Sequence, residues 1–386
     1  MDIAALRAEE ARYIIGLDSD PNCLGTDAAL ARLRGTGAGL QLKPLVVKHY
    51  PYEAWFRARL ATGRATAKDI GCLHYEVGER LAEAAADLQT NHGADGAPQL
   101  IGAMGHAAAH APRRAGQAFG NLTLGESAVI AERTGLPVVS NFAARDIAAH
   151  GQGGPLTGYA DWVMFHRHDR TSLRIHLGGL ARVTVVTPAV EDMLAFETGP
   201  CMMALDGALQ ILTSGTHLVD PGGQAAAKGV VISDFFEDLM EHSFFHKVPP
   251  KTTGITEFGP EIYLRDAIKS RLDRGHSMND FAATVTAVVA TSIIRAFNRF
   301  IKPRYNIARV IFSGSGAGHK PLMKALEDGL TGMTLRNSSA YGLGPNAIGP
   351  LAAAILANEF VFGAPTAYPK ATGAKHPTVL GQWTPA

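Results

Sequence analysis

Short apolar strand patterns alternate with amphipathic helical patterns through both halves of this 386-residue chain. Apolar runs rich in β-branched residues predict strands at 13–16, 45–49, 100–103, 138–139, 172–177, 180–187 and 309–312. Apolar residues at helical spacing predict helices at 68–88, 127–134, 203–212, 280–301 and 351–359. Such alternation is typical of an α/β fold with helices packed on central sheets.

The length of the chain predicts two domains, each with enough apolar residues for its own core. A His- and Arg-rich turn that begins at His166 reads as a solvated connection between them. We therefore expect an N-terminal α/β lobe at 1–168 and a C-terminal α/β lobe at 169–386. The Pro- and Gly-rich tail of the second lobe could pack back on the first.

The charge, the N-terminal residues and the cysteine content of the chain exclude several classes of protein. The 36 basic and 35 acidic residues leave a net charge of +1, so no overall field favours nucleic acid or an anionic membrane. The first residues lack the apolar core of a signal peptide, and no apolar run approaches the roughly 18 residues of a membrane span. The widely spaced Cys23, Cys72 and Cys201 fit neither a disulfide framework nor a zinc site, and Cys72 is expected in a helix core. We expect a cytoplasmic protein.

One stretch, at 136–156, combines a short strand, a lone acid and a glycine-rich loop. Asp146 follows the strand at 138–139, and parallel sheets place ligand crevices just beyond such strand ends. Gly151, Gly153 and Gly154 come next, and glycines allow the backbone to approach a bound molecule closely. The alternative is structural: Asp146 caps a short helix and the glycines only turn the chain.

Further glycine turns lie in the C-terminal half of the chain. Gly178 and Gly179 lie between two β-branched strands and predict a hairpin turn. A Gly-x-Gly strand-to-helix turn at 314–317 is of the type that lets a nucleotide approach the backbone. Pro200 precedes a helix whose first N–H groups could bind an anion if nothing obstructs them. His106 and His110 have the spacing of paired metal ligands on one helix face, but no third ligand is near, so we predict no metal site.

In this order the segments resemble the anhydro-N-acetylmuramic acid kinase family of the sugar-kinase, actin and heat-shock ATPase superfamily. The matching segments are DAAL at 27–30, LTLGE at 122–126, NFAARDIAAHGQGGPL at 141–156, LGGLARVTVV at 177–186, FETGPCMMALDGA at 196–208, PPKTTG at 249–254, SGSGAGHKPLM at 313–323 and TGAKHPTVLG at 372–381. The resemblance implies a two-lobed, actin-like sugar-kinase (ribonuclease H-like) fold with an interlobe cleft. It also implies ATP-dependent hydrolytic opening and phosphorylation of a 1,6-anhydro amino sugar in cell-wall recycling, with ATP and Mg²⁺ as cofactors, a small sugar as substrate, and a homodimer.

The resemblance also assigns roles to residues. Asp146 falls on the family's general base. The residues that would face the sugar are Glu126, Arg145, Gly151, Gly153 and Gly154. The residues that would face the nucleotide are Ser19, Gly25, Gly178, Gly179, Gly199, Pro200, Gly314 and Gly316. No residue is assigned as a metal ligand.

Departures from the family pattern lie mainly on the phosphate side. The first phosphate loop, at 17–27, has Leu24 where the family has an acid expected to hold Mg²⁺, and it contains Asp20 and Pro21. The loop that begins at Lys251 reads KTTGIT and the strand end at 104–107 reads MGHA, both different from the family pattern. Further replacements are Ala143, His176, Arg182, Cys201, Met202 and Asn346. Asp18 or Asp20 could take over the metal role. Two alternatives to the kinase therefore stay open: a degenerate, inactive homologue (a pseudokinase) that binds a ligand or partner without phosphoryl transfer, and a hydrolase that only opens the anhydro bond.

Overall fold

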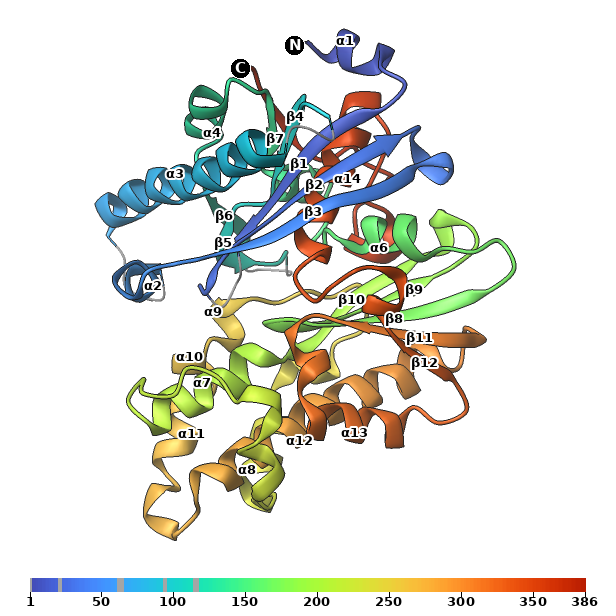
Figure 1. Cartoon of the computed structure of the whole chain (residues 1–386). Coiled ribbons are helices and arrows are strands. Elements are labelled where there is room, and N and C mark those ends of the chain that lie inside the picture. Colours follow the sequence, from blue (N-terminus) through green and yellow to red (C-terminus); the bar gives the residue numbers. More distant parts are fainter. Residues whose placement is uncertain (1, 20–22, 61–65, 93–95, 114–117) are drawn as a thin grey trace. The chain divides into compact units, whose positions relative to one another are not determined.

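The computed structural model describes residues 2–19, 23–60, 66–92, 96–113 and 118–386. The chain forms two compact units, one of residues 1–165 together with 346–386, and one of residues 166–345 (Figure 1). Each unit is built on its own mixed sheet with helices packed on it. The α/β class predicted from the alternation is confirmed. The second unit ends at Pro345 because the helix and tail that follow pack with the first unit.

The sheet of the first unit has the strand order β13-β7-β4-β1-β2-β3. Its strands are β1 (Arg12–Ser19), β2 (Gly25–Arg34), β3 (Gln41–Pro51), β4 (Leu100–Ala103), β7 (Val138–Ser140) and β13 (Gln382–Thr384). β1, β4 and β7 run parallel, whereas β2, β3 and β13 pair antiparallel with their neighbours. β5 (His106–Ala111) and β6 (Gly120–Leu124) form a separate hairpin. Of these parallel strands, β7 ends directly before the helix that carries Asp146.

The prediction of a loop at 17–27 is wrong at both ends of that range, where the described residues belong to strands. Leu17, Asp18 and Ser19 continue β1, and Gly25 to Asp27 begin β2, which pairs antiparallel with β1; residues 20–22 between them lie outside the described part. β2 escaped prediction because alanine is depleted in strands. Its apolar positions are three alanines and two leucines, at Ala28, Ala29, Leu30, Ala31 and Leu33, all of them buried.

Helices cover both faces of this sheet. They are α1 (Ile3–Ala8), α2 (Ala54–Leu60), α3 (Ala67–His92), α4 (Ser127–Thr134), α5 (Phe142–Ala148), α6 (Gly158–Phe165), α14 (Ile348–Phe362) and α15 (Pro369–Thr372). The predicted α3 is confirmed, but Cys72 on it is exposed, not buried, since the next residue, Leu73, lies on the core face. α4 ends, as predicted, at Gly135 in the left-handed conformation (φ 66°).

Two glycines allow α14 to lie directly on the sheet. Gly16 in β1 and Gly102 in β4 are register partners. A Cβ at Gly16 would fall 1.7 Å from the Pro350 carbonyl oxygen, and one at Gly102 would fall 2.2 Å from the Ala353 carbonyl oxygen. The alternate residue Ile15 points to the opposite face, into the core built with α3. α14 is therefore part of the first unit and is held there by close backbone contact.

The sheet of the second unit has the order β10-β9-β8-β11-β12. Its strands are β8 (Thr171–Leu177), β9 (Leu180–Val186), β10 (Leu194–Pro200), β11 (Ile307–Ser313) and β12 (Thr334–Asn337). Its helices are α7 (Met202–Leu212), α8 (Ser233–Met240), α9 (Ile255–Phe258), α10 (Pro260–Tyr263), α11 (Arg265–Lys269), α12 (Met278–Ala296) and α13 (Lys320–Gly329). The hairpin predicted around Gly178 and Gly179 and the strand-to-helix turn after β11 are both confirmed.

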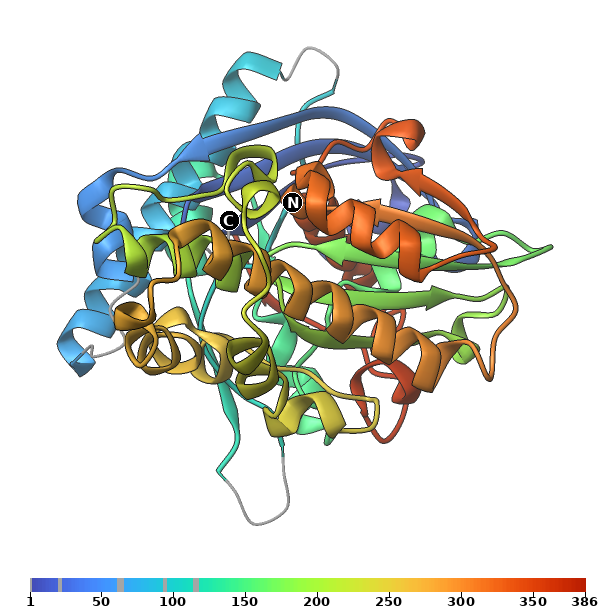
Figure 2. The same cartoon turned by 90° about the horizontal axis from the view of Figure 1, so that it is seen from below.

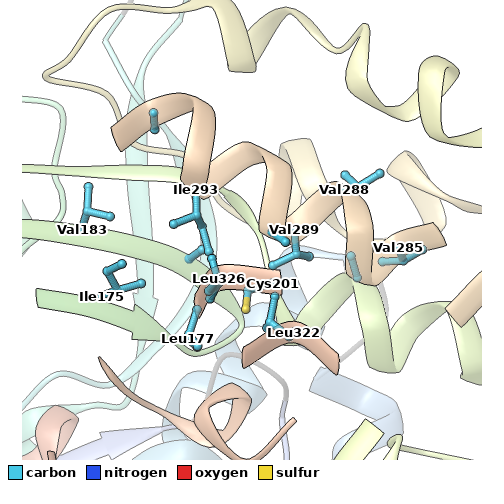
Figure 3. Close-up of a cluster of buried hydrophobic side chains, with 14 of the residues drawn as sticks. Ile175, Leu177, Val183, Cys201, Val285, Val288, Val289, Ile293, Leu322 and Leu326 are labelled. Atoms are coloured by element: carbon cyan, nitrogen blue, oxygen red, sulfur yellow. The ribbon is translucent and has the colours of Figure 1, made fainter. Parts of the chain in front are cut away.

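α12 is the central core helix of the second unit, and Figure 2 shows it running across the strands. A capping box between Ser277 and Asp280 starts it, and it continues into a π-helical turn at Phe297–Ile301. The segment Met278–Ile301 is long and apolar enough to cross a membrane, but 67% of its most apolar window is buried inside the protein. Val285, Val289 and Ile293 pack beside Leu177 and Leu322 (Figure 3).

Candidate functional site

Asp146 lies inside α5, the helix that directly follows β7. Asn141 (φ 51°) is the N-cap residue of this helix, so the interpretation of Asp146 as a helix cap is wrong. The helix turns Phe142 and Asp146 inward, and the Asp146 side chain is completely buried. Arg145, the neighbouring candidate, is exposed on the other side of the same helix.

The glycine loop closes around the Asp146 carboxylate. The Gly153 amide donates a hydrogen bond of 2.7 Å to Oδ2, and the Gly151 amide donates one of 2.8 Å to the Asp146 backbone carbonyl. A Cβ at Gly151 would lie 2.2 Å from Oδ2, so only glycine leaves room for the carboxylate there. Within the described chain, Oδ1 is buried and has no partner in hydrogen-bond geometry. One carboxylate oxygen is thus anchored by a backbone amide, whereas the other is buried and not anchored in this way.

Burial raises the pKa of Asp146 above its ordinary value, and the nearby Thr372 side chain and the Gly153 amide partly oppose this shift. A carboxylate whose pKa is raised towards neutrality is a better proton acceptor than an exposed one. The tail brings Thr372 to this position, because the Gln152 amide donates to the Thr372 carbonyl (2.9 Å). The arrangement is suited to general base catalysis.

The other residues predicted to face a sugar lie in different elements of the first unit. Gly154 follows Gly153 in the loop, next to Pro155. Glu126 is the N-cap residue of α4, where it accepts from the Ala128 amide (2.9 Å) and pairs with His74 Nε2 (3.1 Å). These two contacts give Glu126 a structural role in the first unit.

Sequence reasoning did not connect His110 or Thr372 with Asp146. His110 belongs to β5, not to a helix, and its Cε1 lies 3.3 Å from where a Cβ on Gly153 would be. Its Nδ1 is 3.2 Å from Asn121 Oδ1 in β6. Both residues reach the loop through tertiary contacts, and no local pattern in the sequence announces such contacts.

Ser19 takes part in a buried polar network at the end of β1. Its hydroxyl is 3.0 Å from the Tyr52 hydroxyl and 3.1 Å from His106 Nδ1, and Thr26 Oγ1 is 2.8 Å from the same Tyr52 hydroxyl. Burial lowers the pKa of His106 to about 4, so the ring is neutral at physiological pH. The network fixes the base of the β1–β2 hairpin, next to Gly25, whose Cβ would fall 2.4 Å from the Tyr50 carbonyl oxygen.

The His106 shift predicts a pH dependence of stability. An unfolded histidine binds a proton with an ordinary pKa of 6.5, whereas folded His106 does so only near pH 4. Protons therefore favour the unfolded chain between these values, and the free energy of unfolding should fall by about 2 kcal/mol between pH 7 and pH 5 from this group alone. In urea titrations at the two pH values, His106→Gln should remove about this much of the wild-type loss. An unchanged pH dependence in the variant would contradict the burial of a neutral His106.

Two aspartates occupy opposed positions in the pairing of β1 and β2. Asp18 and Asp27 are directly opposed in the antiparallel ladder of β1 and β2. Asp27 Oδ1 is 2.7 Å from His49 Nδ1, and burial raises the pKa of Asp27 against the lowering effect of His49 and Asn346. A Cβ on Gly349, at the start of α14, would fall 1.9 Å from Asp18 Oδ2. Opposed carboxylates repel one another unless a proton or cation lies between them, and their oxygens are the ligand type of Mg²⁺.

In the second unit, the glycines predicted to face a nucleotide form one backbone cluster. A Cβ at Gly314 (φ 83°) would fall 2.5 Å from the Leu177 carbonyl oxygen, and one at Gly316 would fall 3.1 Å from Met202 Sδ. Gly199 is packed against the Phe245 ring (2.6 Å from its would-be Cβ), and Pro200 ends β10. The three turns around residues 178, 199 and 315 therefore meet at one end of this sheet.

The start of α7 is obstructed, so it does not present free N–H groups to an anion. The Cys201 and Met203 amides donate to the Gly179 carbonyl (3.0 and 3.1 Å), and the Met202 amide donates to the Gly178 carbonyl (3.0 Å). Cys201 itself is buried in the core, which raises the pKa of its thiol (Figure 3). These bonds tie the β8–β9 turn to α7 and rigidify the glycine cluster.

A family model and several known proteins match this chain over nearly its whole length. A family model described as anhydro-N-acetylmuramic acid kinase matches residues 12–386. An anhydro-N-acetylmuramic acid kinase of Salinibacter ruber is 35% identical over 390 residues, with 98% of each chain covered. One of Caldanaerobacter subterraneus subsp. tengcongensis is 34% identical with 97% of each covered, and one of Francisella tularensis subsp. novicida is 31% identical, covering 97% of this chain and 98% of that relative.

Solved structures that resemble this chain have much lower sequence identity. Component A of the Acidaminococcus fermentans (R)-2-hydroxyglutaryl-CoA dehydratase matches with a TM-score of 0.46 and 16% identity, covering 91% of this chain and 99% of that one. A ROK family glucokinase from Streptomyces griseus matches with a TM-score of 0.37 and 12% identity, covering 90% and 99%.

Proposed function

Because the chain belongs to the anhydro-N-acetylmuramic acid kinase family, we propose that it uses ATP to open and phosphorylate 1,6-anhydro-N-acetylmuramic acid. The observation that carries the proposal is the buried Asp146, anchored through one oxygen by the glycine loop and unpartnered at the other within the described chain. The family match favours this function over a binding-only homologue or a simple hydrolase.

In the proposed reaction Asp146 acts as the general base. Its free oxygen takes a proton from a water molecule, and that water attacks the anomeric carbon of the anhydro sugar. The bridging C–O bond breaks at the anomeric carbon, and the released oxygen accepts the terminal phosphoryl group of ATP. The Gly153 amide holds the carboxylate in place, and its raised pKa increases its strength as a base. Proximity of base, water and phosphoryl donor couples the two steps.

The chain offers groups that suit the phosphoryl donor and its metal. Asp18 and Asp27, opposed across the β1–β2 hairpin, supply the oxygen donors that would hold Mg²⁺, in place of the acid that Leu24 replaces. When bound, Mg²⁺ neutralises charge on the phosphates. The glycine cluster of the second unit would lie against the nucleotide, because its side-chain-free backbone permits close approach. We expect the protein to work in the cytoplasm on a small sugar; a homodimer follows from the resemblance alone.

The test is direct. Purified protein is incubated with ATP, Mg²⁺ and 1,6-anhydro-N-acetylmuramic acid, and products are followed by phosphorus NMR and mass spectrometry. The proposal predicts a sugar phosphate and ADP in equal amounts. Sugar opening without ADP would identify a hydrolase. Thermal stabilisation by the sugar with neither product would identify the binding-only homologue, since a ligand stabilises the fold whether or not it reacts.

A further inference from the structure

The second unit contains a cavity of about 370 Å³ whose lining includes none of the residues assigned to the proposed reaction. Its walls come from the end of β10, from the 3₁₀ turn Ser243–His246 with the loop after it, and from α12 with its π-helical turn. The residues that matter for its chemistry are Phe245, His246, Lys251, Arg295, Arg299 and Phe300. π-Helical turns are rare and are frequently found at functional sites.

Lys251 is a buried cation at this cavity. Its side chain belongs to a residue only 3% exposed, and Nζ donates one hydrogen bond, to the Phe244 carbonyl (3.0 Å). An ammonium group has three donors, so two remain. Burial, with Lys247 and Arg299 nearby, lowers the pKa of Lys251 to about 8, which leaves most of the group charged at pH 7. A buried charge without a counter-ion is costly.

The carboxylates near Lys251 are engaged with other groups. Glu257 Oε1 is 3.0 Å from Lys247 Nζ, and Glu257 Oε2 accepts from the Thr253 hydroxyl (2.8 Å). Glu197 accepts from the Thr252 hydroxyl (2.8 Å) and the Thr253 amide (2.6 Å). Lys251 Nζ lies over the Phe244 ring, 4.4 Å from its centroid, and 5.9 Å from the centroid of the Phe300 ring. Across the described ranges no carboxylate forms an ion pair with Lys251, so no direct counter-ion balances its positive charge at the cavity.

Two arginines add to this charge. Arg295 and Arg299 line the same cavity from the end of α12 and from the π-helical turn, and both are exposed to solvent. Arg299 also lies over the Phe300 ring, 5.0 Å from its centroid, and no ion pair with a carboxylate holds either arginine within the described chain. Arginine binds phosphate and carboxylate groups through paired hydrogen bonds. Three cations therefore line one small cavity.

We propose that this cavity binds a small organic phosphomonoester. The phosphate group would lie against Lys251, Arg295 and Arg299, because a dianion balances their charge better than a single carboxylate does. The organic part would lie between Phe245 and Phe300, which supply the apolar surface typical of small-molecule sites of this size. The site lies wholly within the second unit, whereas Asp146 belongs to the first.

The experiment measures binding of phenyl phosphate by isothermal titration calorimetry at pH 7, with a non-hydrolysable ATP analogue and Mg²⁺ in excess to fill any nucleotide site. The wild type should bind one equivalent. Arg299→Gln should weaken binding about tenfold, and Lys251→Met should weaken it about a hundredfold, as expected for lost hydrogen bonds to charged groups. Arg304→Gln, an exposed arginine outside the cavity lining, is the matched control and should leave affinity unchanged.

Each result of the binding experiment either supports or overturns the proposed site. Thermal melting of each variant checks that it is folded, and the exposed Arg299 keeps the test valid if Lys251→Met does not fold. Absence of wild-type binding, displacement of phenyl phosphate by the ATP analogue, or unchanged affinity in Arg299→Gln would overturn the proposal. Benzoate bound as tightly as phenyl phosphate would overturn the assignment to phosphomonoesters. None of these results depends on phosphoryl transfer, so the test is independent of the kinase assay.

Discussion

Asp146→Asn should lower the rate of sugar phosphorylation about a thousandfold, the usual contribution of a general base. The variant should stay folded, because asparagine keeps the shape of the side chain and its carbonyl can still accept from the Gly153 amide. The measurement is kcat for formation of the sugar phosphate at pH 7. Asp169→Asn, an exposed aspartate paired with Arg170, is the matched control and should leave kcat unchanged.

The free energy of unfolding of Asp146→Asn distinguishes a catalytic role of Asp146 from a structural one. Burial raises the pKa of Asp146, so the folded chain binds its proton more tightly than the unfolded chain does. Stability from this group is therefore full below the unfolded pKa and falls as pH rises through the folded pKa. Asparagine carries no charge, so at pH 7 the free energy of unfolding of the variant should equal or exceed that of wild type. A variant that is much less stable and equally active would show that Asp146 only holds the loop.

Gly16→Ala should lower the free energy of unfolding of the protein by about 3 kcal/mol, at the upper end of overpacking costs. The added Cβ would fall 1.7 Å from the Pro350 carbonyl oxygen, and a backbone atom between a strand and a core helix cannot move aside cheaply. Urea unfolding monitored by circular dichroism measures the change. Because only the folded protein is active, the kinase should lose activity in proportion to the unfolded fraction. Displacement of α14 would also move Gly349, which lies against Asp18.

Gly71→Ala is the matched control for this substitution. Gly71 is exposed in α3, and a Cβ there would have no atom within 4 Å. Alanine in an exposed helix position should therefore raise the free energy of unfolding by about 0.5 to 1 kcal/mol. If Gly16→Ala were as stable as wild type, α14 could not lie on β1 as described.

Local patterns predicted most of the elements, since their signals lie within a few residues. The helices α3, α4 and α12, the β8–β9 hairpin and the turn after β11 all follow from spacing and glycine caps. β2 was missed because its alanines carry little strand preference. Cys72 was misplaced because a lone apolar residue beside a helix stripe can fall on either side of the core boundary.

What the sequence could not provide were contacts between distant segments. The glycine loop around Asp146 is local, so its role as a close-fitting wall could be anticipated from residues 146–154. The approach of His110 and Thr372 to that loop, the Gly178 and Gly179 carbonyls that obstruct α7, and the return of α14 to the first unit all depend on tertiary packing. The opposed Asp18 and Asp27 became visible only when the predicted loop proved to be a hairpin.

In the proposed mechanism Asp146 directs water onto the sugar while the released oxygen is phosphorylated. A single-turnover reaction in water enriched in heavy oxygen, with ATP, Mg²⁺ and the anhydro sugar, tests it by mass spectrometry of the product. We expect a sugar phosphate in which the heavy oxygen is at the anomeric carbon and the phosphate carries none, and we expect Asp146→Asn to form this product about a thousandfold more slowly. Heavy oxygen in released inorganic phosphate without sugar phosphate, or product formation by Asp146→Asn at the wild-type rate, would contradict this mechanism.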